Sequence, residues 1–158
     1  PDITDKGELL VARISMAVAI VVATYLGINP PGFAAQVVAL AFGIAGASLF
    51  PALMMGIFSK RINNYGAIAG MLAGLLTTLV YIFVYKGWFF VAGTANLPDT
   101  EEFWLLGISP MSFGAIGALI NFVVAFLVSS ATQAPPLHIQ QLVESVRSPR
   151  GAGSAIDH

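Results

Sequence analysis

The side chains able to carry chemistry are few, and none of them forms a catalytic or metal-binding pattern. Cysteine is absent, which excludes disulfides, thiol catalysis and thiolate metal sites. His138 and His158 lie twenty residues apart and make no convincing metal pair. Ser48 has no histidine or lysine in reach to activate it, and neither HExxH nor a phosphate-binding glycine loop occurs. We therefore expect no enzyme, and no metal or cofactor held by these residues.

Composition instead indicates a membrane protein. Hydrophobic residues make up 57% of the 158 residues and charged residues only 9%, and the mean hydropathy is +0.83. A soluble domain usually devotes about a quarter of its residues to charged types. The net charge of −1 gives no electrostatic basis for binding nucleic acid. The lipid bilayer is the expected partner.

Four apolar stretches are long enough to cross a bilayer, which takes roughly 20 residues for a hydrocarbon core about 30 Å thick. They predict an all-α membrane protein with four transmembrane helices at about residues 9–28, 33–58, 65–85 and 111–130. Residues 1–134 then form one transmembrane bundle with an outer loop at 86–110. Residues 135–158 form a polar tail.

The basic residues predict the orientation of these spans. Four spans place both ends of the chain on one side of the membrane. Six of the seven basic residues then share that side: Lys6, Arg13, Lys60, Arg61, Arg147 and Arg150. Because basic loops favour the cytoplasm, we expect both ends and the tail to be cytoplasmic, in a multi-pass protein of the inner (plasma) membrane.

The second span contains Gly43, Gly46, Ser48 and Pro51 within three turns. Proline has no N–H, so Pro51 leaves a backbone carbonyl near Ala47 without its usual donor. In lipid that carbonyl needs another partner, and Ser48 is close enough to help. The stretch is either a packing kink or a flexible gate.

Small residues recur at helical spacing in the third and fourth spans, where they let helices approach closely. The residues with this spacing are Gly66, Gly70, Gly74, Gly114 and Gly117. Asn121 places an amide at membrane depth in the fourth span, and such a group is expensive unless it is hydrogen-bonded. We expect an interhelical hydrogen bond, with a role in a transport pathway as the alternative.

Two short helices are expected outside the spans. Asp99, Glu101 and Glu102 precede an aromatic turn at 103–106, which predicts a short helix on the outer surface. The acids either coat a solvated lid or recruit cations. Residues 138–147 carry apolar side chains at helical spacing, which predicts an amphipathic helix that lies on the membrane or docks on a partner.

Three segments together resemble the sodium:solute symporter family. They are ASLFPAL at 47–53 followed by Phe58, GAIAG at 66–70, and the tail from APP at 134–136 to RSPRG at 147–151. The pattern is most similar to the cation/acetate symporter branch, whose relatives work with a small membrane subunit. The resemblance covers nearly all of this sequence but about the last third of a typical family member. We therefore interpret the chain as a C-terminal fragment.

The resemblance implies a LeuT-type fold, with a core of two inverted five-helix repeats and extra helices at the ends. The first two spans correspond to the last two core helices, and the other two are C-terminal additions. It implies sodium-coupled uptake of a small solute, such as acetate or another monocarboxylate, by alternating access. Sodium would be the coupling ion, sited outside this fragment, as would the substrate. The implied partners are the N-terminal helices and a small membrane subunit.

Two alternatives remain open at this point. One is a non-transporting membrane anchor or sensor input domain. The other is a helical assembly subunit that dimerises through Gly66, Gly70 and Gly74.

Overall fold

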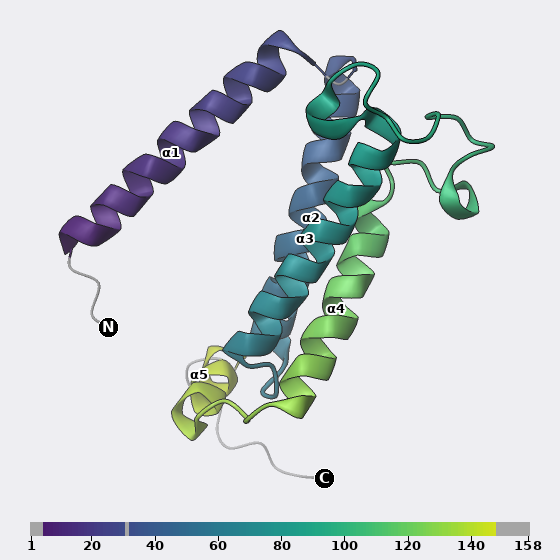
Figure 1. Cartoon of the computed structure of the whole chain (residues 1–158). Coiled ribbons are helices and arrows are strands. Elements are labelled where there is room, and N and C mark those ends of the chain that lie inside the picture. The colour runs from purple at the N-terminus through teal and green to yellow at the C-terminus, as the bar shows by residue number, and fades with distance from the viewer. Residues whose placement is uncertain (1–4, 31, 148–158) are drawn as a thin grey trace.

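The computed structural model describes residues 5–30 and 32–147, and every regular element in these residues is helical (Figure 1). The long helices are α1 (Asp5–Ile28), α2 (Ala34–Phe58), α3 (Asn64–Lys86) and α4 (Gly114–Ala131). The shorter ones are the 3₁₀ turns η1 (Trp88–Phe90) and η2 (Leu105–Gly107) and the tail helix α5 (Leu137–Arg147). The four long helices are long and apolar enough to cross a membrane, as predicted.

The helix ends differ slightly from the expected bounds. α1 begins four residues before position 9, and acidic Glu8 suits the first turns of a helix. α4 begins at Gly114 instead of 111, because residues 109–113 form turns, with Ser112 N donating to Ser109 O at 2.9 Å. α3 ends where Gly87 adopts φ 89°, a backbone conformation that favours glycine.

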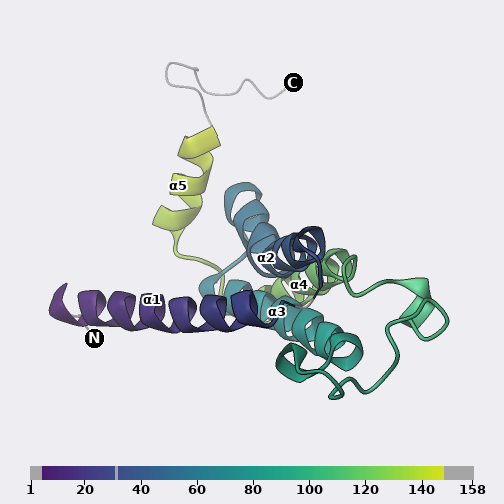
Figure 2. The ribbon, with the colours of Figure 1, turned by 90° about the horizontal axis from the view of Figure 1, so that it is seen from above.

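α2, α3 and α4 pack side by side, and the contact between α3 and α4 is the most extensive (Figures 1 and 2). The contact is close because glycines face the neighbouring backbone. A Cβ added to Gly66 would lie 2.6 Å from Ala125 O, and one added to Gly70 would lie 2.7 Å from Asn121 O. A Cβ added to Gly114 would lie 2.5 Å from Gly43 O on α2. No side chain fits at these positions without moving a backbone.

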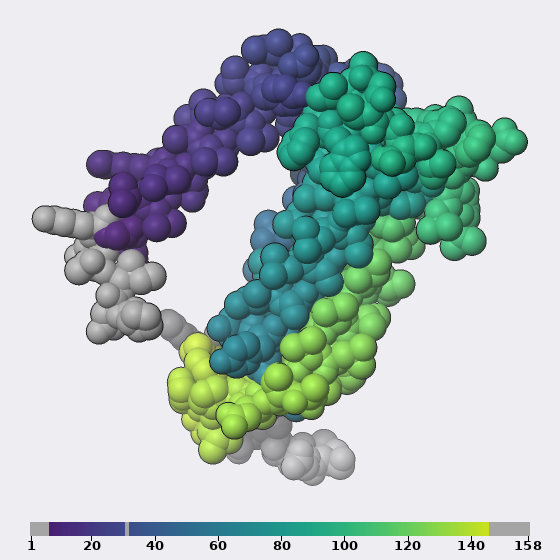
Figure 3. All heavy atoms as spheres, viewed as in Figure 1, coloured from purple at the N-terminus to yellow at the C-terminus, as the bar shows by residue number. Residues whose placement is uncertain are grey.

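α1 stands apart from this bundle. Within the described residues it makes no helix–helix contact, and its apolar side chains are exposed along its whole length. The space-filling view shows an open space between α1 and α3 (Figure 3). A side-chain hydrogen bond joins it to the rest, from the Tyr25 hydroxyl to Phe89 O at 3.1 Å. An apolar helix with no protein neighbour is stable only among lipids or against further helices.

The end of the bundle where α3 leads into α4, here called the loop end, is held by side chains of α3. The Tyr81 hydroxyl donates to Ile108 O at 2.7 Å, and the Tyr85 hydroxyl donates to Phe103 O at 2.8 Å. Lys86 forms an ion pair with Asp99. These contacts tie the long connection to the helix that precedes it.

The short outer helix predicted around residues 99–106 is wrong. The structure has turns there and then the single 3₁₀ turn η2, in which Leu106 adopts φ 56°. Asp99 accepts a hydrogen bond from Trp104 Nε1 at 3.0 Å, and Leu105 N donates to both tyrosine hydroxyls at 3.2 Å. Backbone and side-chain groups engaged with α3 in this way are not free to form a helical ladder.

The opposite end, here called the tail end, is held by the turn between α2 and α3. Arg61 Nη2 donates to Ser130 O at 3.0 Å and to Thr132 O at 3.1 Å, which satisfies carbonyls at the C-terminus of α4. Asn63 caps α3 by accepting from Gly66 N at 2.8 Å, and its amide donates to Gln133 O at 2.8 Å.

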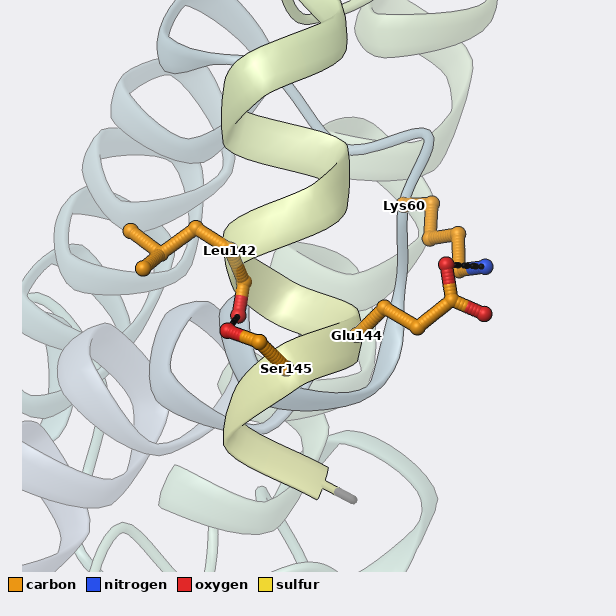
Figure 4. A network of polar contacts seen from close by, with 4 residues as sticks. All are labelled: Lys60, Leu142, Glu144 and Ser145. Atoms are coloured by element: carbon orange, nitrogen blue, oxygen red, sulfur yellow. Dashed lines mark hydrogen bonds and ion pairs between the residues drawn. The ribbon is translucent and has the colours of Figure 1, made fainter. Parts of the chain in front are cut away.

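The amphipathic tail helix is confirmed as α5, which lies across the tail end instead of along the bundle (Figures 1 and 2). Its Glu144 carboxylate pairs with Lys60 Nζ at 2.9 Å, while Leu142 lies on the other side of the helix (Figure 4). Both charged side chains are exposed, so the pair contributes at most about 1 kcal/mol.

The glycine contacts generate a stability prediction. A Cβ added to Gly74 would lie 2.8 Å from Gly117 O, whereas one added to Gly56 would meet nothing within 4 Å. We expect Gly74→Ala to lower the free energy of unfolding by about 1–3 kcal/mol, as overpacking does. The matched Gly56→Ala should be neutral or stabilising by up to about 1 kcal/mol. Equilibrium unfolding of the full-length protein in mixed micelles measures both, and equal effects would contradict the packing.

Candidate functional site

Pro51 interrupts the backbone hydrogen-bond ladder of α2, because proline has no N–H. Pro51 lies inside α2 with its ring buried. It cannot donate to the carbonyl of Ala47, four residues earlier, and its ring pushes that carbonyl away. In the apolar part of a membrane an unpaired carbonyl is unfavourable by several kcal/mol, so this carbonyl needs a partner from elsewhere in the fold.

That partner comes from α4. The Asn121 amide donates to Ala47 O at 2.9 Å and to Ser48 O at 2.8 Å. Asn121 is fully buried, 74 residues away from Ala47 along the chain. Ser48, the expected donor to the freed carbonyl, instead contributes a second acceptor. Asn121 thus makes the interhelical hydrogen bond expected of it, and the acceptor is the carbonyl that Pro51 leaves free.

The oxygen of the same amide has no hydrogen-bond partner among the described residues. It faces Gly70 of α3, because a Cβ added to Gly70 would meet Asn121 Oδ1. Glycine carries a hydrogen in that position, and a Cα–H pointing at an oxygen is weakly attractive. Asn121 of α4 therefore contacts both neighbouring helices. Its amide N–H groups donate to carbonyls of α2, and its amide oxygen faces α3.

Small residues surround this junction and leave no open space in it. A Cβ added to Gly74 would meet Ala47 O, and one added to Gly117 would meet the hydroxyl of Thr78. Thr78 is itself buried and donates to Gly74 O at 2.7 Å. The carbonyls and the amide are neutral, so the junction joins α2 to α4 but offers no charged group to a substrate.

The residues proposed as a gate do not all face the same way. A Cβ added to Gly43 would lie 3.7 Å from Gly114 Cα, so Gly43 is on the α4 side together with Pro51. A Cβ added to Gly46 would meet nothing within 4 Å. Gly46 therefore faces open space, away from the junction.

The described residues offer no cluster of side chains suited to a metal ion. No group of three or more histidine, cysteine, aspartate or glutamate side chains close enough to hold a metal ion occurs there.

Sequence reasoning missed the residues that fasten the two ends of the bundle. These are Arg61 and Asn63 at the tail end and Tyr81 and Tyr85 at the loop end. The spacing of Tyr81 and Tyr85 could have indicated their role, because they lie four residues apart on one face of α3, close to its end. The acceptors of all four residues lie far away in the sequence, so no local pattern identifies them.

A double-mutant cycle tests the junction. We expect Asn121→Leu to lower the free energy of unfolding by about 2–3 kcal/mol, because it leaves the carbonyl of Ala47, which Pro51 already deprives of a helical donor, buried and unpaired. An alanine at position 51 would supply the missing N–H to Ala47 O. In the Pro51→Ala background, Asn121→Leu should therefore lower the free energy of unfolding by about 1 kcal/mol less than it does in the unmodified protein. The four unfolding equilibria are measured in mixed micelles, and additive effects would show that the two residues are not coupled.

Comparison with known proteins gives one family match and several relatives. Residues 2–74 match the sodium:solute symporter family. The chain is 35% identical over 136 residues to an uncharacterised symporter of Cupriavidus necator strain H16, covering 86% of this chain and 19% of the relative. It is 33% identical over 132 residues to the osmoregulated proline transporter OpuE of Bacillus subtilis strain 168, covering 84% and 23%.

A sodium/proline symporter of Staphylococcus aureus is 28% identical over 145 residues, covering 91% of this chain and 26% of the relative. The chain thus spans about a fifth to a quarter of the length of these curated relatives. No solved structure matches it significantly. The chain is therefore similar over most of its length to proteins named as symporters and transporters, and over α1, α2 and the first half of α3 to the sodium:solute symporter family.

Proposed function

We propose that this chain is part of a sodium-coupled secondary transporter of the sodium:solute symporter family. The observation that carries the proposal is the similarity to named symporters over most of the chain, which has four helices able to cross a membrane. The coupling sodium ion and the solute would bind to parts of the transporter outside these residues. The LeuT-type arrangement of inverted repeats belongs to the same proposal.

The exposed apolar surface of α1 supports membership of a larger assembly. Among the described residues α1 packs against none of the other long helices, and such a membrane helix is expected to pack against further helices of the transporter. The glycine face of α3 argues against the alternative of an assembly subunit that dimerises through Gly66, Gly70 and Gly74. Those glycines already face α2 and α4 of the same chain, so that face is not free for a second copy.

For the substrate, the relatives favour proline over acetate. Two of them are named for proline, and the acetate branch expected from the sequence finds no support among them. The small membrane subunit was expected through that branch, so it is not part of the proposal. We place the tail end of the bundle, with Lys60 and Arg61, in the cytoplasm on the strength of the positive-inside rule.

Uptake by the full-length protein in vesicles tests the substrate and the coupling ion. We expect radiolabelled proline to accumulate when an inward sodium gradient is imposed and not when potassium replaces sodium. Excess unlabelled proline should abolish the signal, and excess acetate should leave it unchanged. Sodium-driven acetate uptake that proline does not inhibit would overturn the choice of substrate, and uptake independent of sodium would overturn the coupling.

The bend at Pro51 would serve this transporter as a hinge in α2. Removing the proline restores a continuous hydrogen-bond ladder and stiffens the helix. We expect Pro51→Ala to change the rate of solute uptake several-fold, while the amount of protein in the membrane stays the same. Leu53→Ala, at an exposed position on the same helix, is the matched control. Unchanged kinetics in Pro51→Ala would show that the bend only serves packing.

A further inference from the structure

Residues 99–107, here called the flap, project from the loop end of the bundle in the green segment between α3 and α4 (Figures 1 and 2). All residues of the flap are exposed except Trp104, which is half-buried against the cluster of Tyr81, Tyr85 and Phe113. A segment with a single packed side chain has low local stability. A small set of polar contacts must therefore hold the flap against α3.

Two tyrosines of α3 clamp the flap from one side. The Leu105 N–H donates to both hydroxyls, each at 3.2 Å. The Tyr85 hydroxyl donates in turn to Phe103 O at 2.8 Å, and the Tyr81 hydroxyl donates to Ile108 O at 2.7 Å. The two hydroxyls thus bind the backbone before, within and after η2.

A separate contact fixes the start of the flap. The Asp99 carboxylate forms an ion pair with Lys86 at the end of α3 and accepts a hydrogen bond from Trp104 Nε1 at 3.0 Å. The Lys86 side chain is 13% exposed, so this pair is partly shielded from water. Because neither tyrosine takes part in it, the pair holds one end of the flap independently of the clamp.

The clamp holds the backbone in a conformation that leucine rarely adopts. Leu106 has φ 56° and ψ 25°, in the left-handed region, which is unfavourable for a residue with a Cβ. Its side chain is 89% exposed, so no packing within the described residues compensates for the strain. The left-handed Phe89 differs, because its ring lies 5.4 Å from that of Phe83, measured between centroids. Strain of this kind persists only where neighbouring contacts enforce it, and at Leu106 these are backbone hydrogen bonds.

We propose that the flap is a strained conformational device, held closed by the hydroxyls of Tyr81 and Tyr85, that opens as one unit while the helices of the bundle stay packed. Loss of the clamp releases three backbone groups together, and relaxation of the Leu106 backbone favours the open form. Opening uncovers both hydroxyls at the loop end. The device uses contacts within this chain only, so it does not depend on the solute or on the coupling ion.

Hydrogen exchange of backbone amides in the full-length protein, measured by mass spectrometry in mixed micelles, tests the clamp. Tyr85→Phe keeps the ring and removes the hydroxyl. The amides of Phe103, Gly107 and Ile108 donate to carbonyls of the flap and not to a tyrosine. We expect all three to exchange at least about fivefold faster in Tyr85→Phe, because the flap opens as a unit.

Tyr65→Phe is the matched control, because Tyr65 is exposed at the opposite end of α3, and it should change none of these rates. The amides of Asn96 and Leu97 are a control within the same loop. Both donate to Val84 O outside the flap, so their exchange should stay the same in Tyr85→Phe.

Substitutions at Leu106 test the strain. Leu106→Gly relieves it and should slow exchange of the three flap amides several-fold, after correction for intrinsic rates. Leu106→Val should speed their exchange several-fold, because a β-branched residue tolerates the left-handed region least. Equal exchange in both variants would overturn the strain as a driving force.

The pattern of exchange in Tyr85→Phe decides between a device and simpler explanations. Faster exchange at Leu105 alone would show that the hydroxyl is only a local acceptor, and would overturn the opening of the flap as a unit. Faster exchange throughout α3 and α4 would show that the whole bundle loosens, and would overturn the independence of the flap. No change at any amide would overturn the clamp.

Discussion

The arrangement of the bundle depends on one missing hydrogen-bond donor. Pro51 frees the carbonyl of Ala47 inside a helix that spans the membrane, where water cannot supply a substitute. Asn121 supplies the donor, but only because α4 approaches α2 closely enough for a short side chain to reach. Glycines make that approach possible, since a Cβ on Gly114 or Gly74 would meet the backbone of α2. Pro51, the Asn121 amide and the glycines are therefore parts of one constraint.

The ends of the helices reinforce this constraint. At the tail end, Arg61 and Asn63 connect the α2–α3 turn to the C-terminus of α4. At the loop end, Tyr81 and Tyr85 hold the connection that leads into α4. With contacts at both ends and in the middle, α2, α3 and α4 form a unit whose members cannot easily move apart. α1 lacks such contacts and is joined to the unit by a short turn containing proline and glycine.

In the transporter that we propose, the separation of α1 from the three-helix unit would matter for alternating access. Motion of one group of helices against another needs rigid bodies with flexible connections between them. The unit of α2, α3 and α4, with α1 joined to it by a short turn, meets this requirement. A hinge inside the unit would require the Asn121 amide to exchange or release its carbonyls, so bending of α2 would be coupled to α4.

The sequence by itself determined the four long helices, with their ends to within about four residues, because apolar length, proline and glycine act locally. It also identified the carbonyl that Pro51 frees and the buried amide of Asn121, but as two separate features. Only the tertiary structure paired them, because the two groups are 74 residues apart and meet through helix packing. It likewise decided that Gly66, Gly70 and Gly74 face helices of the same chain and that tyrosine hydroxyls prevent a helix near Leu105. Local patterns state what a group requires, and only the packed fold decides which distant residue provides it.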